Sequence, residues 1–222
     1  MALMSQPPAH LNFWKQHFGQ VPESVWDHSD VETLVLADND LNEVSASIGR
    51  LKRLRMLDLG HNSLRAVPES LGEIENLSDF LYLHDNRLES LPSSLASLKR
   101  LRYLNISENA FDTLPECVCG MQSLVELRAS DNPLTTLPDC VRQLTALREL
   151  HLRNTKLKSL PDSIAGLREL RQIDLRGTPL ECLPPALAGL PRLEKIDLRW
   201  VTNFETPAWF ADLQARGCLV YL

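Results

Sequence analysis

Aliphatic and polar residues follow one another along this chain in a frame that recurs many times. The frame starts as LxxLxL and runs into an Asn, as in residues 54–64 (LRMLDLGHNSL), 101–111 (LRYLNISENAF) and 124–134 (LVELRASDNPL). Its second and third aliphatic positions lie two residues apart, so in a short strand both side chains point to one face and the residue between them points to the other. The frame then continues as LxxLPxxLxxL, as in residues 157–169 (LKSLPDSIAGLRE). Each copy is therefore predicted to hold one short strand and a return segment.

The frame has a fixed period. A proline recurs at intervals of 24, 23, 23, 23, 23 and 23 residues, at Pro68, Pro92, Pro115, Pro138, Pro161, Pro184 and Pro207. An asparagine recurs with the same period and the same single insertion, at Asn39, Asn62, Asn86, Asn109 and Asn132, and its next two positions hold Thr155 and Thr178. Complete copies begin at Val31, Leu54, Ser78, Leu101, Leu124, Leu147, Leu170 and Leu193. Strands repeated at one pitch stack in parallel about 4.8 Å apart, and the copies bury their aliphatic side chains against one another.

The recurring asparagine and the recurring proline each have a physical role in such a stack. The Asn amide is expected to bond backbone groups where the chain leaves the strand, because those groups are otherwise buried without partners. The Leu-Pro pair is expected to start a short extended or 3₁₀ segment, since proline fixes φ and lacks only an N–H that has no partner there.

These residues resemble the leucine-rich repeat, in the 23-residue LPxxLxxL form of intracellular Ras-suppressor-type and bacterial proteins. The resemblance covers about residues 18–215. It implies an α/β repeat solenoid: a curved horseshoe with a parallel sheet on the concave face, short 3₁₀ or extended segments on the convex side, and helical caps. The chain departs from the pattern in three places: an extra residue lies within Leu77–Leu81, Ser45 replaces the first proline, and threonines replace the last asparagines.

The two ends are predicted to seal the solenoid. Residues 1–30 are expected to form a helical cap and half repeat, with a helix over residues 8–17, followed by repeats over residues 31–215 and a cap over residues 206–222. In that last cap Thr206 starts a helix, Gly217 stops it and residues 218–222 add a strand. The end aromatics, Trp14, Trp26, Trp200 and Trp209 with Phe13, Phe18, Phe204, Phe210 and Tyr221, are expected to cover the core, a ligand cage being the alternative.

Composition narrows the classes of protein. A net charge of −6 argues against general affinity for nucleic acid or anionic membrane. No apolar run approaches the roughly 18 residues of a membrane helix, and the N-terminus lacks the pattern of a signal peptide. Five cysteines without a framework spacing fit a reducing compartment. A cytoplasmic monomer is expected.

Candidate chemistry is sparse. The chain carries no nucleotide-binding, metalloprotease or nucleophile-elbow motif, so neither catalysis nor a cofactor is expected. Cys117 and Cys140 occupy the same position of adjacent copies, so they are ordinary repeat residues, a disulfide or a metal clip. His61 and His84 fall near each other at strand ends, but no third metal ligand is evident, and no metal site is predicted.

The outward strand positions form columns and bring two groups together. Met56, Phe80, Tyr82 and Tyr103 form an exposed aromatic patch typical of a partner-binding surface, unless the insertion turns Phe80 inward. Arg153, Arg176 and Arg199 form a ladder on successive strands, beside Arg128 and His151. The ladder either receives acidic or phosphorylated groups of a partner or pairs with Glu149, Asp174 and Asp197. Acidic residues at the other end (Asp38, Asp40, Asp58, Asp85, Glu108 and Asp131) would make the groove bipolar.

The sequence thus predicts a non-enzymatic module that binds a protein or peptide on its concave face, in signalling or scaffolding as the resemblance implies. One alternative is a bacterial type III effector that binds a host protein, since residues 1–8 (MALMSQPP) are compatible with an export leader. A second alternative is a carbohydrate-binding or enzymatic solenoid.

Overall fold

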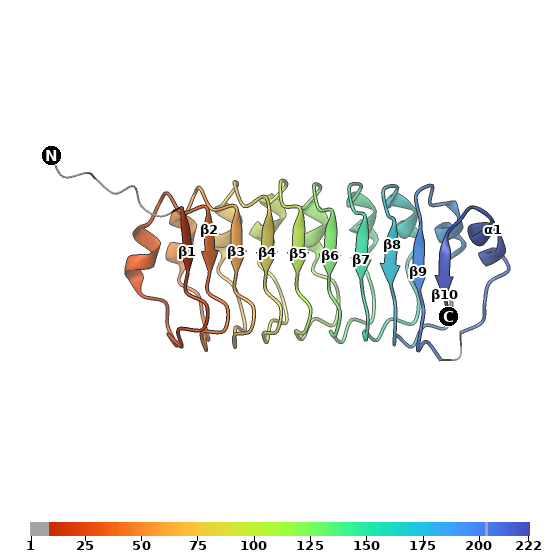
Figure 1. Cartoon of the computed structure of the whole chain (residues 1–222), viewed down its shortest axis with the longest axis horizontal. Coiled ribbons are helices and arrows are strands. Elements are labelled where there is room, and N and C mark those ends of the chain that lie inside the picture. The colour runs from red at the N-terminus through yellow and green to blue at the C-terminus, as the bar shows by residue number, and fades with distance from the viewer. Residues whose placement is uncertain (1–8, 203) are drawn as a thin grey trace.

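The computed structural model describes residues 9–202 and 204–222 and shows one open sheet of parallel strands, paired in chain order (Figure 1). The strands are β1 (His10–Asn12), β2 (Thr33–Val35), β3 (Met56–Asp58), β4 (Phe80–Tyr82), β5 (Tyr103–Asn105), β6 (Glu126–Arg128), β7 (Glu149–His151), β8 (Gln172–Asp174), β9 (Lys195–Asp197) and β10 (Leu219–Tyr221). In the view of Figure 1 they stand side by side in a single uncurled row, with the return segments behind them. The predicted parallel solenoid is confirmed.

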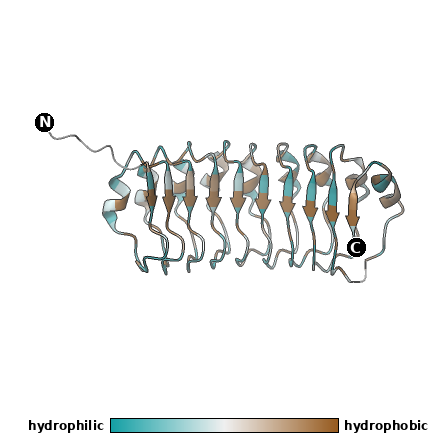
Figure 2. Ribbon diagram, in the orientation of Figure 1, coloured by the Kyte–Doolittle hydropathy of each residue, from teal (hydrophilic) through white to brown (hydrophobic). Residues whose placement is uncertain are grey.

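The register of the sheet follows the period of the sequence. Leu104, Leu127, Leu150 and Ile173 pair across successive strands, and each is at most 1% exposed. The flanking residues of each strand point the other way, to the side that we call the open face. Figure 2 shows both hydrophilic and hydrophobic stretches along β7 and β8. The predicted inward and outward positions are therefore confirmed.

Each return segment contains one 3₁₀ turn. The turns are η1 (Glu23–Asp27), η2 (Ala46–Arg50), η3 (Glu69–Glu73), η4 (Ser93–Ser97), η5 (Glu116–Gly120), η6 (Asp139–Gln143), η7 (Asp162–Gly166) and η8 (Pro185–Gly189). A proline precedes every turn but η2, with φ between −57° and −72°. At η2 the hydroxyl of Ser45 instead accepts a hydrogen bond from the Ser47 backbone N–H at 3.2 Å, so serine caps the turn that lacks a proline.

The side chains of the recurring asparagines form hydrogen bonds with the backbone where the chain leaves each strand. The Asn132 Nδ2 donates to the carbonyls of Ile106, Ala129 and Ser130 at 2.9–3.2 Å, and its Oδ1 accepts from the Phe111 N–H. This confirms the predicted role of the amide. The two threonines that replace it later make one such bond each: Thr155 donates to the Leu152 carbonyl, and Thr178 donates to the Leu175 carbonyl.

The predicted N-terminal helix over residues 8–17 is wrong. Residues His10–Asn12 form β1, and Leu11 pairs with Leu34 one period later. An extended segment is favoured because β2 offers unpaired backbone groups at the edge of the sheet, whereas an isolated ten-residue helix is marginal. The N-terminal part of the described chain is therefore a shortened repeat, completed by η1 behind Pro22. Residues 1–8, with the suggested export leader, lie outside the described residues.

The C-terminal cap matches its prediction more closely. Helix α1 (Phe210–Ala215) ends before Gly217, which has a φ of +89°, and β10 pairs with β9 as expected. The helix starts later than predicted, at Phe210 after the N-cap residue Trp209, and no side chain caps it. No helix of the described residues is long and apolar enough to cross a membrane.

The end aromatics are divided between core and surface. Trp26 is fully buried and Phe210 is 3% exposed, so both cover the core as predicted. Trp14 and Trp200 instead keep 59% and 70% of their surface exposed. Trp14 lies in a turn two residues after β1 and Trp200 in a turn three residues after β9, so the predicted covering role is wrong for these two.

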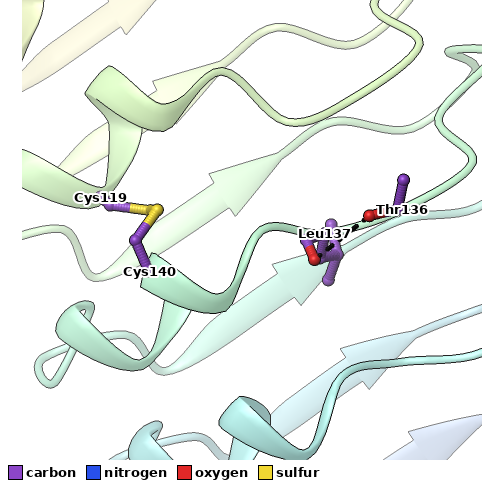
Figure 3. Close-up of a disulfide and its surroundings, with 4 residues drawn as sticks. All are labelled: Cys119, Thr136, Leu137 and Cys140. Carbon is purple, nitrogen blue, oxygen red and sulfur yellow. Dashed lines mark hydrogen bonds between the residues drawn. A yellow bond between two sulfur atoms is a disulfide. The ribbon is translucent and has the colours of Figure 1, made fainter.

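A disulfide joins two successive 3₁₀ turns, through a different pair from the one that the sequence left open as a possible disulfide. Cys119 is bonded to Cys140 (Figure 3). Cys117 is free. The turns are staggered: the fourth residue of one faces the second residue of the next. A Cβ placed on Gly49 would accordingly lie 2.8 Å from the Ser70 Cβ. Cys119 and Cys140 hold these two positions, whereas Cys117 and Cys140 hold equal positions.

Candidate functional site

The open face carries a cluster of aromatic rings on β4 and β5, which we call the aromatic cluster: Phe80, Tyr82 and Tyr103. The ring centroids of Phe80 and Tyr82 are 5.9 Å apart with nearly parallel planes, and the Tyr103 ring lies 5.5 Å and 5.0 Å from them. Phe80 is 42% exposed, so the alternative in which it turns inward is wrong. Half-buried Met56 pairs with Phe80 across the sheet and extends the cluster toward β3.

The phenols of the cluster stay neutral over the physiological range. Burial, partly offset by the charge of Arg128, raises the pKa of Tyr103 to about 12. Burial and the nearby carboxylate of Asp58 raise the pKa of Tyr82. Both side chains therefore offer an apolar ring together with a hydroxyl that can donate a hydrogen bond. A cavity of about 290 Å³ beside the cluster is lined by Asp79, Phe80, Arg102, Tyr103, Val125 and Glu126.

Arg128 lies beside the aromatic cluster. Its Nε donates to the Glu126 Oε1 at 2.6 Å, and its guanidinium carbon lies 6.0 Å from the centroid of the Tyr103 ring. Burial disfavours the charged guanidinium, but the hydrogen bond to Glu126 and the nearby negative charges, Glu149 among them, together outweigh it and raise the pKa of Arg128. This arginine is therefore held by a carboxylate and an aromatic ring at once.

Two arginines of the predicted ladder are engaged by carboxylates of their own strands. The Arg176 Nε and Nη2 donate to the two carboxylate oxygens of Asp174 at 2.9 and 2.6 Å. Arg199 binds Asp197 in the same bidentate way, at 2.9 and 2.8 Å. Burial acts to raise the pKa of both aspartates, but the hydrogen bonds and the charge of the arginines together outweigh it and lower the pKa of each.

The third member of the ladder is engaged as well. Arg153 Nη2 donates to the Asp131 Oδ2 at 3.1 Å. All three arginines thus face a carboxylate, and the geometry favours the ion-pair lattice over a basic receptor for acidic groups. A groove of about 300 Å³ lies on this part of the open face, lined by Asn105, Ser107, Glu108, Arg128, Ser130, Asp131, His151, Arg153, Gln172, Ile173, Asp174, Arg176, Lys195 and Asp197. Its cationic and anionic side chains balance, so the groove is not the basic half of a bipolar surface.

His151 lies between two carboxylates at the centre of the open face. Its Nε2 is 3.4 Å from the Glu149 Oε2 and 3.7 Å from the Glu126 Oε1. That nitrogen is shielded from solvent and has no hydrogen-bond partner in the described part of the chain. Burial and the charge of Arg128 lower the pKa of His151. The sequence placed His151 on the open face but did not connect it with either glutamate.

The two histidines at the strand ends do meet, as predicted. The Nε2 atoms of His61 and His84 are 3.2 Å apart, and the His61 Nδ1 is 2.7 Å from the Asp85 Oδ2. The His84 ring rests on Gly60, where an added Cβ would come within 2.3 Å of it. Burial and the neighbouring His61 lower the pKa of His84. Among the residues that the structure describes, no third potential metal ligand joins these two imidazoles.

Sequence reasoning left the pairing of the ladder open and missed one feature of the face. Asp174 and Asp197 precede their arginines by two residues, a spacing that in an extended chain puts both side chains on one face and favours the pairs that form. Trp200 was assigned to the cap, but its ring lies 5.9 Å from the guanidinium of Arg176 and 6.0 Å from that of Arg199. No periodic signal marks it, because it falls in the last, irregular repeat.

Comparison with known protein families gives a match over most of the chain. The model of the family described as "Leucine rich repeat" matches residues 29–88, 79–134 and 146–200, and that of "Leucine Rich repeats (2 copies)" matches residues 122–166. A search of curated proteins found no match.

Several solved structures share the fold. A leucine-rich repeat protein of Leptospira interrogans is 24% identical, with a TM-score of 0.70 over 95% of this chain and 64% of that one. The plant peptide hormone receptor RGFR1, solved in complex with RGF2, is 27% identical, with a TM-score of 0.76 over 90% of this chain and 32% of the receptor. The ectodomain of the Arabidopsis thaliana receptor kinase GASSHO1/SCHENGEN3, in complex with CASPARIAN STRIP INTEGRITY FACTOR 2, is 24% identical, with a TM-score of 0.65 over 87% and 27%.

The chain therefore spans between about a quarter and two thirds of the length of these structural relatives. Its repeat frame, its parallel sheet and the family match over residues 29–134 and 146–200 agree with one another. This chain belongs to the leucine-rich repeat family.

Proposed function

We propose that the chain is a non-catalytic interaction module that binds a protein or peptide partner on its open face, in a scaffolding or signalling role. The aromatic cluster carries this proposal. Phe80 is 42% exposed on β4, a strand inside the sheet. Contiguous large apolar side chains at a surface are typical of interaction sites, and tyrosine is enriched among the residues that dominate binding energy.

The backbone beneath the cluster supports binding without rearrangement. Strand β4 is paired with β3 on one side and β5 on the other, so its side chains project from a hydrogen-bonded support. A preformed surface loses little conformational entropy when it binds, which leaves more of the contact energy for affinity. The residue that docks on the cluster is expected to be apolar or aromatic, because the phenols are neutral and Arg128 is already paired.

The structural relatives support a protein or peptide as the ligand. Two of the solved structures are complexes, one with RGF2 and one with CASPARIAN STRIP INTEGRITY FACTOR 2. Because the chain matches only about a third or less of those receptors, this support concerns the class of ligand and not its identity.

The test compares two double variants. A partner captured by the wild-type chain is titrated against Tyr82→Ala/Tyr103→Ala and against Ser93→Ala/Ser97→Ala, two exposed residues of η4 behind the sheet. The tyrosine variant is expected to weaken binding by about 2 kcal/mol or more, roughly thirtyfold in Kd, while the serine variant binds like wild type. Circular dichroism confirms that both fold. Equal affinity of the tyrosine variant and wild type would refute the proposal.

A further inference from the structure

Three potential metal ligands converge on the open face, next to the aromatic cluster. Glu149 and His151 are two residues apart on β7, so both side chains leave the same face, and Glu126 pairs with Glu149 from β6. One carboxylate oxygen of each glutamate and one ring nitrogen of His151 all lie within 4.8 Å of one another. The three side chains are half-buried and rise from adjacent hydrogen-bonded strands, so the sheet fixes their spacing.

The spacing around the His151 imidazole matches that of metal ligands. His151 Nε2 is shielded from solvent, lacks a hydrogen-bond partner among the described residues, and lies 3.4 and 3.7 Å from the two carboxylate oxygens. Ligand atoms bonded to a tetrahedral metal at about 2.1 Å lie roughly 3.4 Å apart. The observed separations from the imidazole are therefore close to those of a metal-bound set, and small rotations of the glutamate side chains would complete it.

The surroundings suit a metal ion of a particular class. Arg128 donates to Glu126 at 2.6 Å and holds that carboxylate in place, as a second layer of hydrogen bonds does around metal ligands. Its positive charge offsets one of the two carboxylate charges. The cluster therefore keeps a net charge of −1, which attracts a divalent cation. An imidazole beside two carboxylates suits first-row transition metals better than Mg²⁺ or Ca²⁺, which prefer oxygen ligands alone.

We propose that Glu126, Glu149 and His151 bind one divalent transition-metal ion, of which Zn²⁺ is the representative. His151 also lines the groove of about 300 Å³, so one side of the cluster remains open to water or to a group from another molecule. The site is independent of the proposed partner binding, because all three ligands come from this chain.

The experiment is a Zn²⁺ titration of the full chain by calorimetry after treatment with a chelator. Because the imidazoles of His61 and His84 also converge, all variants are made in a His84→Gln background, which removes that second chelate. Glu149→Gln and His151→Gln test the site, and Glu108→Gln, a carboxylate that lines the same groove, is the matched control. Thermal unfolding followed by circular dichroism establishes that each variant folds.

One Zn²⁺ per chain is expected in the background protein. Glu149→Gln and His151→Gln are each expected to weaken binding at least about tenfold, while Glu108→Gln leaves it unchanged. Visible absorption of the Co²⁺-loaded protein should show the bands of tetrahedral nitrogen and oxygen coordination, and these bands should vanish in His151→Gln. Absence of Zn²⁺ binding, or equal Zn²⁺ affinity in His151→Gln and its background, would overturn the proposal and leave an ion-pair cluster.

Discussion

Arg199 grips Asp197 with two hydrogen bonds, from Nε at 2.9 Å and from Nη2 at 2.8 Å, and the aspartate side chain keeps only 2% of its surface exposed. Arg176 Nε adds a second positive charge 3.8 Å from the same carboxylate. Taking a carboxylate out of water is unfavourable unless charge and hydrogen bonds compensate it. The arginines at this end of the sheet therefore compensate the charges of the aspartates that they contact. This part of the open face is a lattice of ion pairs.

This pairing predicts how stability depends on pH. Burial acts to raise the pKa of Asp197, but the bonds and charge of Arg199 outweigh it and lower the pKa below that of the unfolded chain, about 3.9. A lowered folded pKa contributes stability that is present above the unfolded value and is lost as pH falls through the folded value. We expect Asp197→Asn to be less stable than wild type at pH 7, and the gap to shrink below about pH 4.

Urea unfolding of both proteins between pH 7 and pH 3 measures this gap. Glu205→Gln, at an exposed position of the C-terminal cap, is the control and should follow wild type. A gap that widens toward low pH would have the wrong sign for a lowered pKa.

The disulfide between η5 and η6 predicts a stability that depends on reductant. A bond that closes a loop of 21 residues restricts the unfolded chain and contributes about 3 kcal/mol. Cys140→Ser should lower the free energy of unfolding by roughly that amount without reductant, and should match wild type in its presence.

Cys117→Ser supplies the matched control for the disulfide, because Cys117 has the same place in its turn as Cys140 but is free. It should leave the response to reductant intact. Thiol titration of the unfolded, non-reduced protein should find three free cysteines, Cys117, Cys182 and Cys218. Five free thiols, or a loss of the reductant response in Cys117→Ser, would contradict the observed pairing.

The stacked core predicts a large cost for a cavity in a central repeat. Leu127 is fully buried between Leu104 and Leu150 of the adjacent strands. Leu127→Ala should reduce the free energy of unfolding by about 2–5 kcal/mol, because neighbours fixed in the repeat cannot close the void. Leu219→Ala, on the edge strand where leucine is 55% exposed, should cost under about 1 kcal/mol. Similar losses of unfolding free energy in the two variants would contradict the difference in burial between Leu127 and Leu219.

The period of the sequence was sufficient to predict the sheet, because every copy places its inward leucines at the same offset. Leu127, Leu150 and Ile173 could therefore be placed without coordinates. The first copy escaped detection because it keeps only Leu11 and Phe13 of the aliphatic frame, and its helix-like spacing competes with pairing to β2. Tertiary pairing decided that competition, and it is invisible to a local pattern.

The candidate site was only partly predictable. Column positions identified the aromatic cluster, since exposure follows from the alternation of a strand. A disulfide was considered only for Cys117 and Cys140 because equal sequence positions were expected to touch, whereas the turns are staggered by two residues. The grouping of His151 with Glu126 and Glu149 depends on side-chain rotamers across two strands, and the repeat frame does not specify these.

Hydroxyl-radical footprinting of the free chain and of its complex with a captured partner tests most directly whether the open face is the binding surface. Binding should slow oxidation of Met56, Phe80, Tyr82 and Tyr103, while Trp209 in the C-terminal cap oxidises at the same rate in both samples. Unchanged oxidation of the aromatic cluster, with protection at Trp209 instead, would contradict binding on the open face.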